Sequence, residues 1–558
     1  MKKKYVRWTL WTIASPFILF IILCILIYLP PIQNFLVDKA AVYASEATGM
    51  NISVGRISLS FPLNLVVTNV DAASPHNDTL LSVRRLQVNV QLLPLLKKQV
   101  EVDGISLQGA TVNSNDLIHG MKLNGTLGEL FISSHGVALD PETAIVNKVL
   151  LKDTDLSLCL NDTAAADTAA SDTTYWKIIL QDIDLQNVSF ALDMPLDSLS
   201  LAASLDNAIL RDGLIDLHKS AYSLQTFRIE NGRVRYDNGK PLAADSLSSG
   251  LDPSHIALTD IGVKLDSLYY GGRNMKAIIS QFVLKERSGV EIVSATGRMV
   301  SNDKVLRVPS LKLETRDSYL ELNAAMDWNA LDFKGEGLMS ARLMADIGKP
   351  DVVRFMGRMD EKFVRQYPSE PLRIRTGIDG DLNKLKLTTL TAELPGALGL
   401  FARGELTHLT DSLLRGGDIT LEAETKDLKF VSTLAEGIEI PYGTRLEGKF
   451  TMAGAKMGTD LLLMQPEAQA VAAADTIPIT VYNDSISVAD DFKMERAARL
   501  FAKYDLSRDR YEADLAVNHF DLHQFMPADS LYTLSTRLKV EGEGFDFFSP
   551  RTYFNAEG

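Results

Sequence analysis

Few residues of this chain stand at spacings that could do chemistry. His519 and His523 are the closest pair of histidines, and on a helix their four-residue spacing would place both rings on one face. The flanking alternation of apolar and polar residues indicates a strand instead, and a catalytic zinc site needs three protein ligands. We therefore expect no metal site at this pair.

Two pairs of acidic residues are candidates for general acid–base chemistry. Asp182 and Asp184 occupy alternate positions of a predicted strand and share its polar face, where solvated carboxylates are usual. Asp490 and Asp491 begin a predicted helix, where acidic residues complement the helix dipole. No histidine lies near either pair in the sequence, so we expect neither to be a catalytic couple.

Sequence motifs of common catalytic sites are also absent. There is no G-x-x-x-x-G-K-[ST] loop, no G-x-S-x-G elbow and no H-E-x-x-H helix. Of the two cysteines, Cys24 lies in an apolar N-terminal run and Cys159 is alone in the rest of the chain, which excludes a disulfide framework. We expect a protein that is not an enzyme and needs no cofactor.

Composition narrows the class of partner. The chain has 558 residues, which is beyond the size of a single core and predicts several domains or an elongated repetitive body. Asp and Glu number 71 against 57 Lys and Arg, a formal net charge of −14. Such a surface repels a phosphate backbone, so we expect no nucleic-acid partner.

The N-terminus predicts a membrane anchor. A basic stub precedes an uncharged run from Trp8 to Leu29, which as a helix would span roughly 33 Å, about one hydrocarbon core. The positive-inside rule keeps the stub in the cytoplasm and exports the chain after Pro31. A cleaved signal peptide is the alternative, but no A-x-A-like site follows Leu29. The predicted anchor residues are Trp8, Trp11, Phe17, Phe20 and Tyr28.

A short amphipathic helix is predicted next, over residues 32–49, with apolar residues mostly at three- and four-residue steps. It either lies on the membrane surface or covers the start of the body, or it is an ordinary packed helix.

The rest of the chain is predicted to be mostly antiparallel β-structure. Apolar and polar residues alternate in many segments, which indicates strands with one apolar and one wet face. A loose unit recurs, in which an alternating strand, a polar or glycine break and another alternating strand follow one another; it begins at Val102, Val146, Trp176 and Leu224. Its uneven spacing suits a long meander with variable hairpins.

Helices are predicted to be few. The candidates are Asp351 to Gln366 and Asp490 to Ala502, and Asp162 to Thr173 is predicted as a low-complexity surface loop. So few helices cannot cover so much apolar sheet. The sheet could pack on a second sheet as a sandwich, close into a barrel, or curl into an open trough filled by lipid tails.

The segment from Gly49 to Leu130 resembles the N-terminal region of the AsmA-like/TamB family. The resemblance rests on the anchor, on NISVGRISLSFPLNLVVTNV from Asn51 to Val70, and on the phrase from Asp78 to Asn113 that contains LLPLL. Further on, the segment from Pro371 to Leu394 is similar to the family's glycine-containing hairpins. Beyond Leu130 the sequence resembles the family only in its general pattern of strands and hairpins.

This resemblance implies an elongated, curled β-sheet, or β-taco, with an apolar groove, rooted in the bacterial inner membrane with its bulk in the periplasm. The family is implicated in phospholipid transport toward the outer membrane and in outer-membrane biogenesis, and it implies phospholipid acyl chains and an outer-membrane barrel protein as partners. No C-terminal domain of the TamB type is recognisable up to Gly558, so the chain is either a fragment or a shorter member. The alternative function is a periplasmic scaffold or assembly factor for outer-membrane proteins, without lipid conduction.

These interpretations predict a domain order and a site. The domains are a stub and anchor (1–31), an amphipathic helix (32–49), a first groove part (50–340), a second groove part with a helix near 351–366 (341–480), and a helix with further strands (481–558). The groove is predicted to be lined by the apolar alternants Leu86, Val88, Val90, Leu92, Ile105, Leu107, Leu156, Leu158, Leu160, Ile183, Leu185, Phe190, Leu320 and Leu322.

Overall fold

The computed structural model describes most of the chain from residue 49 onward, together with a few earlier positions. The described residues are 39, 41–42, 45, 49–60, 64–74, 79–91, 102–114, 121–138, 142–161, 175–239, 250–332, 336–357, 359–434, 437–465, 496–527, 530, 532–545 and 552–558. The predicted anchor, Leu92, Asp490 and Asp491, and the low-complexity segment after Asp162 lie outside these residues.

The described residues are mostly β, as predicted, and the pairing between strands is largely antiparallel. They fall into two compact units, one made of Met1–Ala244 with Asp252–Arg287, the other of Asp245–Leu251 with Ser288–Gly558. We call them unit 1 and unit 2.

Unit 1 is a sheet whose strands reach 18 residues in length. Each strand pairs with the next along the chain, except that β8 pairs with both β9 and β10, and β11 also with both. A 3-10 turn, η1 (Pro195–Asp197), precedes β8. The strands are β1 (Asn51–Ser60), β2 (Asn64–Ala73), β3 (Thr79–Val90), β4 (Val102–Asn113), β5 (Met121–Ala138), β6 (Thr143–Leu160), β7 (Lys177–Met194), β8 (Leu199–Asp216), β9 (Ala221–Leu224), β10 (Thr226–Asp237), β11 (His255–Gly271) and β12 (Asn274–Glu286).

One pair in unit 1 departs from the antiparallel prediction. β6 and β7 are parallel, with Thr143 opposite Lys177 and Cys159 opposite Asp193. Parallel neighbours need a crossover connection of about a dozen residues or more, and residues 161–176 between these strands are long enough. Alternation within a strand carries no information on its neighbour's direction, so the sequence pattern could not show this.

Unit 2 contains shorter strands, and from β19 to β24 their registers run without a shift. The segment that resembles a family hairpin forms β17 and β18, which pair antiparallel. The strands are β13 (Glu291–Ser301), β14 (Val305–Thr315), β15 (Tyr319–Asp327), β16 (Met339–Ile347), β17 (Leu372–Gly380), β18 (Lys384–Leu394), β19 (Leu398–Thr407), β20 (Gly416–Thr425), β21 (Arg445–Ala453), β22 (Lys456–Met464), β23 (Ala497–Asp505), β24 (Arg510–Asp521), β25 (Thr533–Glu543) and β26 (Tyr553–Glu557).

The helix predicted from Asp351 to Gln366 is two helices. α4 (Lys349–Met356) ends at Gly357, whose φ of 75° lies outside the helical region, and α5 (Glu361–Gln366) begins after Asp360. The side chain of Asp360 accepts a hydrogen bond from the backbone of Lys362 and caps α5. Short 3-10 turns also occur in unit 2: η2 (Trp328–Asp332), η3 (Lys429–Thr433) and η5 (Leu522–Gln524).

The helix predicted from Asp490 to Ala502 is wrong over its described part. Ala497–Asp505 is β23, paired on both sides with β22 and β24. The sequence AARLFAKYD fits either period over so short a stretch, and pairing on both edges decides for the strand.

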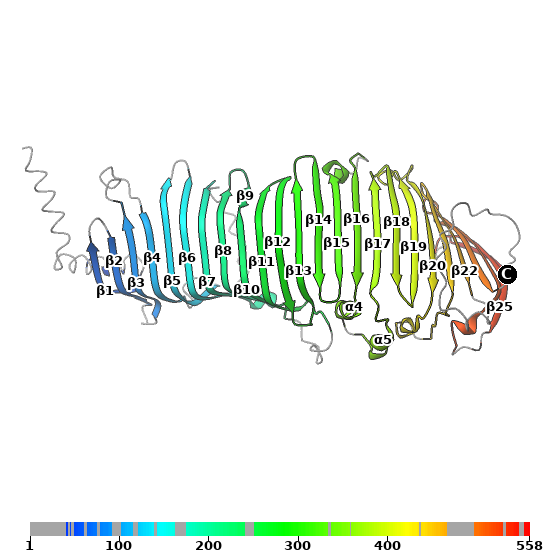
Figure 1. Cartoon of the computed structure of the whole chain (residues 1–558), viewed down its shortest axis with the longest axis horizontal. Coiled ribbons are helices and arrows are strands. Elements are labelled where there is room, and N and C mark those ends of the chain that lie inside the picture. The colour runs from blue at the N-terminus through cyan, green and yellow to red at the C-terminus, as the bar shows by residue number, and fades with distance from the viewer. Residues whose placement is uncertain are drawn as a thin grey trace, which may run out of the picture. The chain divides into compact units, whose positions relative to one another are not determined.

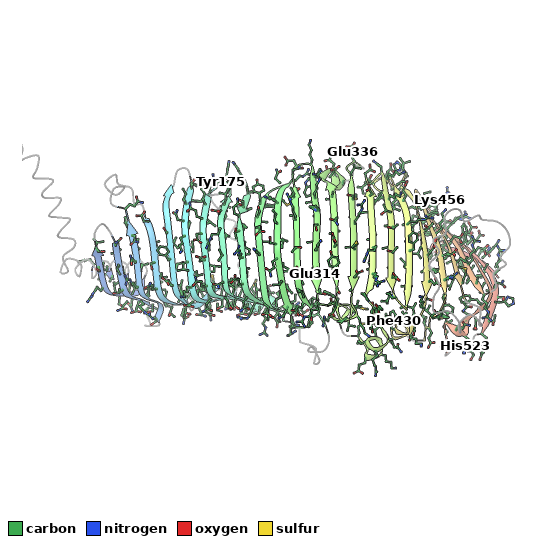
Figure 2. The ribbon with its side chains drawn as sticks, in the orientation of Figure 1. Tyr175, Glu314, Glu336, Phe430, Lys456 and His523 are labelled. Carbon is green, nitrogen blue, oxygen red and sulfur yellow. The ribbon has the colours of Figure 1, made fainter. Side chains whose placement is uncertain are left out.

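A small closed core lies at one end of the unit 2 strands, where α5 meets η3. Phe363 is 1% exposed and its ring meets Phe430 edge-on at 5.6 Å between centroids. Tyr367 completes the trio of rings, 5.1 Å from Phe430, and burial raises the pKa of its phenol. Figure 2 labels Phe430 at this lower end of the strands. Leu394, Ala397 and Leu428 complete the buried cluster.

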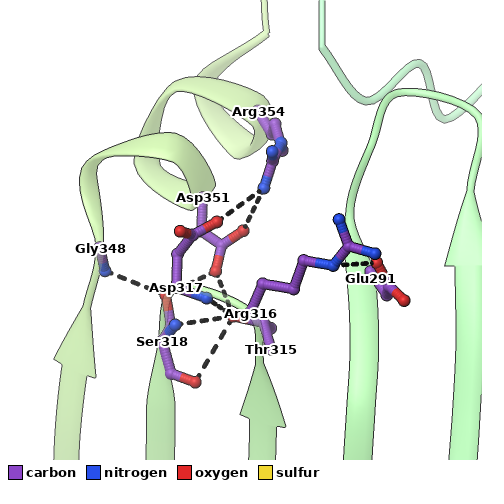
Figure 3. A network of polar contacts seen from close by, with 8 residues as sticks. All are labelled: Glu291, Thr315, Arg316, Asp317, Ser318, Gly348, Asp351 and Arg354. Carbon is purple, nitrogen blue, oxygen red and sulfur yellow. Dashed lines mark hydrogen bonds and ion pairs between the residues drawn. The ribbon is translucent and has the colours of Figure 1, made fainter.

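A buried carboxylate fixes the start of α4. Asp351 is 1% exposed and accepts hydrogen bonds from the hydroxyls of Thr315 and Ser318, the latter at 2.6 Å. Arg354 forms ion pairs with Asp351 at 3.0 Å and with Asp317 at 3.2 Å (Figure 3). Each donor belongs to the β14–β15 turn or to α4, so the network ties that helix to that turn. The polar groups of this network have hydrogen-bond or ion-pair partners, so a structural role accounts for it.

Candidate functional site

The predicted groove residues of β3, β4 and β7 share one face of unit 1. The register puts Leu86 opposite Leu107 and Val88 opposite Ile105. Because directly opposed residues point to the same side of a sheet, these pairs can be followed from strand to strand. The Leu86 row continues through Leu107, Leu130, Leu151 and Leu185, and the Val88 row through Ile105, Ile132, Val149 and Ile183.

The predicted residues of β6 and the far half of β7 also oppose apolar partners. Leu156 lies opposite Phe190, and Leu158 lies opposite Leu192. Leu160 pairs with Met121, and Val90 pairs with Val102 after a shift in register.

The reverse face of unit 1 is polar along a matching row. Arg85 opposes Gln108, and the row continues through Glu129, Lys152, Gln186 and Asn207. Alternation in each strand and register between strands therefore agree. One face is apolar and the other is polar over several neighbouring strands, and not only within a single strand.

A row of kinks crosses unit 1 and was missed by sequence reasoning. Six residues of this row have φ in the left-handed region, between 48° and 61°: Asn69, Gly109, Asp153, Asn187, Asn231 and Asp260. Asn187 donates to Asp153 at 2.9 Å on the neighbouring strand, and Lys285 donates to Asp260 at 2.7 Å. Figure 1 shows these strands side by side and bent toward their lower ends.

The kinks explain the recurring unit in the sequence. What was predicted as strand, break and strand is one strand bent at the break, at Gly109 in β4, Asp153 in β6, Asn187 in β7 and Asn231 in β10. Pairing with the neighbours resumes beyond each kink, so the chain bends and does not reverse. The change of phase at Gln186–Asn187 in β7, which is a signal of a bulge or kink, marks one of these kinks. The available signal was a one-residue change of phase beside Asn, Asp or Gly.

A glycine faces one of the kinks because no side chain fits there. A Cβ on Gly128 would lie 2.7 Å from the Cβ of Asp153, closer than real Cβ atoms approach. Several of the buried side chains of unit 1 flank the same row: Thr154 is 2% exposed, Val83 6% and Ala110 8%. Residues beside the kinks are thus packed tightly, while the apolar rows away from them are not.

In unit 2, Leu320 and Leu322 begin apolar rows of the same kind. The Leu320 row alternates small and large residues through Ala345, Ile374, Ala392, Leu400, Ala423, Leu446, Leu463 and Ala498 to Val517. The Leu322 row passes through Leu343, Thr376, Leu390, Ala402, Leu421, Gly448, Leu461 and Leu500 to Leu515.

Exposure separates these rows from a packed core. Every described residue of the predicted groove is half-buried, apart from Phe190, which is 39% exposed. A residue in the core between two sheets would be fully buried. The sites Leu86, Val88 and Leu107 therefore keep one side available.

The polar candidates have structural partners. Asp182 and Asp184 both pair with Arg211, Asp184 at 3.1 Å, which fits the solvated polar face expected for them. His519 lies in β24, a strand as predicted, and His523 stacks on Tyr532 at 4.9 Å. Among the described residues no cluster of His, Cys, Asp and Glu could hold a metal ion.

A buried histidine in unit 1 was not singled out by the sequence. His255 is 5% exposed, and its Nδ1 lies 2.8 Å from a carboxylate oxygen of Asp252. This hydrogen bond is the main reason that the pKa of Asp252 is lowered. The backbone of Ser254 also donates to Asp252, so the group closes the turn before β11.

The predicted anchor residues Trp8, Trp11, Phe17, Phe20 and Tyr28 lie outside the described residues. Across the part of the chain that the structure describes, no helix is both long and apolar enough to cross a bilayer.

Comparison with models of known protein families and with curated protein sequences gives no match to this chain.

Proposed function

We propose that this protein is a membrane-anchored periplasmic carrier of phospholipid between the inner and outer membranes of a bacterium. The observation that carries the proposal is the set of mostly apolar rows that run from strand to strand, through Leu86 and Val88 in unit 1 and through Leu320 and Leu322 in unit 2, while the side chains of these four residues stay half-buried.

In the proposed structure the sheet curls into a groove with its apolar face inside. The tight packing of Val83, Ala110 and Thr154 beside the kinks supports this, because residues on the inner side of a bend are crowded together. The charged row through Arg85 and Lys152 then faces water.

The mechanism is passive partition along the groove. An acyl chain gains about 0.8 kcal/mol for each methylene that leaves water, so a lipid is held without a specific polar site. No residue acts as a catalyst and no cofactor takes part. The anchor from Trp8 to Leu29 holds the groove at the inner membrane, and an outer-membrane barrel protein is the partner that the family resemblance suggests at the far end.

Site-specific photo-crosslinking in living cells tests the proposal. A photoreactive residue at Val88 faces the apolar row, and the same residue at Asn89 next to it faces the polar row, where Asn89 opposes Gly104. We expect phospholipid adducts at Val88 and none at Asn89. A second pair in unit 2, Leu461 against Asp460, should repeat the result, since Asp460 is ion-paired with Arg499 on the polar face.

Absence of lipid at both Val88 and Leu461, with only products within the chain, would contradict lipid transport. That outcome would favour the scaffold for outer-membrane proteins, whose apolar face is covered by protein.

A further inference from the structure

A hollow lies on the apolar face of unit 2, between β20 and the segment after β25. Its volume is about 540 Å³, in the range of small-molecule sites in proteins. Small residues form its floor, in a row where Thr459 opposes Ala502 and Ala502 opposes Ala513. Phe450, opposite Thr459, stands beside the floor as a wall.

Aromatic rings bound the other side of this hollow. Tyr504 and Tyr511 oppose one another on β23 and β24, in the row next to the floor. Phe545 comes from the segment after β25 and stacks on Tyr511 at 4.8 Å between centroids, with Tyr504 at 5.9 Å. Gly544, with φ of 76° and a backbone hydrogen bond to Asp509 at 2.8 Å, sets this turn of the chain. Phe545 is nonetheless 60% exposed, so its ring covers the hollow without being packed in a core.

We propose that this hollow, which we call the Phe545 site, holds a single acyl chain of a phospholipid. The inference rests on the proposed function and adds to it a fixed station on the apolar face, where one chain is retained between Phe545 and the floor of Thr459, Ala502 and Ala513.

The shape and chemistry of the site select this occupant. Almost all of the surface that lines the site is apolar, which suits a hydrocarbon chain better than a peptide with its polar backbone groups. A peptide strand cannot add to the sheet here, since β22, β23 and β24 are paired on both edges. What remains is a narrow apolar chain that can continue along the Leu461, Leu500 and Leu515 row.

The edge beside the site gives the polar head of such a lipid a place in water. Figure 2 labels Lys456, the first residue of β22, at the upper edge of these strands, next to Met457 of the site. The hydroxyl of Tyr504 donates to Asp509 in the β23–β24 turn, which raises the pKa of Tyr504 and keeps its phenol neutral. Charged and polar groups therefore begin where the hollow ends.

The test uses the full-length protein, purified in detergent and mixed with phosphatidylcholine vesicles in which one acyl chain carries a diazirine. After illumination, adducts are mapped by peptide mass spectrometry. We expect the peptides that contain Tyr504, Tyr511 and Phe545 to be labelled at least fivefold more than the peptides of β15 and β16. Ala502→Leu fills the floor and should reduce labelling there at least fivefold.

Ala423→Leu is the matched control, because Ala423 lies on the same face between Leu400 and Leu446 and outside the site. It should leave labelling at the Phe545 site within twofold of the wild type. Phe545→Ala should also lower that labelling, while Phe501→Ala, on the polar face of β23 opposite Asp460 and Asp514, should not. Far-UV circular dichroism confirms that each variant is folded.

Labelling spread evenly over both units and unchanged by Ala502→Leu would overturn the Phe545 site and leave the proposed transport intact. No labelling at all would overturn both. A photoreactive residue at Phe450 that captured a peptide, or labelling by free diazirine palmitate with none from the phospholipid, would show a different occupant and reject the inference.

Discussion

Units 1 and 2 reach similar apolar faces in different ways. Strands of unit 1 run to 18 residues and bend at a common row of left-handed residues, such as Asn187 and Asn231. In unit 2, β19 to β24 run 9 to 12 residues in unbroken register, and the end of the sheet is closed by α5, η3 and the core around Phe363. A row of left-handed residues therefore bends the strands of unit 1, whereas β19 to β24 of unit 2 pair without a shift and a cluster of buried rings lies around Phe363.

The two units also differ in the residues that they bury, and these residues contribute most to stability. In unit 1 the buried residues include small side chains beside the kinks, such as Val83 and Ala110, and polar groups at strand ends, such as His255 and Glu286. In unit 2 large rings are buried, and a carboxylate, Asp351, is buried with them in a satisfied network. A long apolar face can remain partly exposed only if buried contacts in other parts of the unit stabilise the fold.

The largest expected effect is at the unit 2 core. Phe363→Ala should cost about 3–5 kcal/mol of the free energy of unfolding, because a fully buried ring leaves a cavity. Phe190→Ala in unit 1 should cost only about 1 kcal/mol, since that ring is 39% exposed. Urea titration followed by hydrogen exchange and mass spectrometry measures both. Equal losses would mean that the apolar face of unit 1 is covered by protein.

An intermediate effect is expected at the kinks. Asn187→Ala should destabilise unit 1 by about 1–2 kcal/mol, because Asn tolerates the left-handed region better than Ala does and the bond to Asp153 is lost. Asn187→Gly should recover most of that loss, since glycine accepts this conformation. Asn207→Ala, on the polar row, serves as the control. Equal rates of amide hydrogen exchange in β6–β8 for the alanine and glycine variants would contradict this explanation. They would show that Asn187 does not stabilise unit 1 through its left-handed backbone conformation.

The smallest effect concerns pH and the turn before β11. The pKa of Asp252 is lowered in the folded protein by the hydrogen bond from His255, so its stabilisation is present at neutral pH, above the unfolded value of about 3.9. It is lost as the pH falls through the lower folded value. Asp252→Asn should thus be less stable than the wild type at pH 6, and the gap in urea midpoint should close toward pH 3.

Sequence reasoning found most of the candidate face and missed its shape. Leu86, Val88, Ile105 and Leu107 were placed on one side by alternation alone, and the register puts them in facing pairs. Apart from the change of phase at Gln186–Asn187, the sequence pattern indicates breaks between strands at the kink residues, because a polar residue after an alternating run also marks a turn. The Phe545 site was not predicted, since it depends on a residue far along the chain from Phe450.

By itself the sequence determined most of the strands and which side of each is apolar, because a period of two is a local property of the backbone. At β23 the local pattern fits either period, and only pairing with its neighbours decided for a strand. Only the tertiary structure decided that β6 and β7 are parallel, that Asn187 bends a strand without ending it, and that Phe545 returns over Tyr511. These features depend on hydrogen bonds and contacts with other strands, and no local pattern encodes the partner.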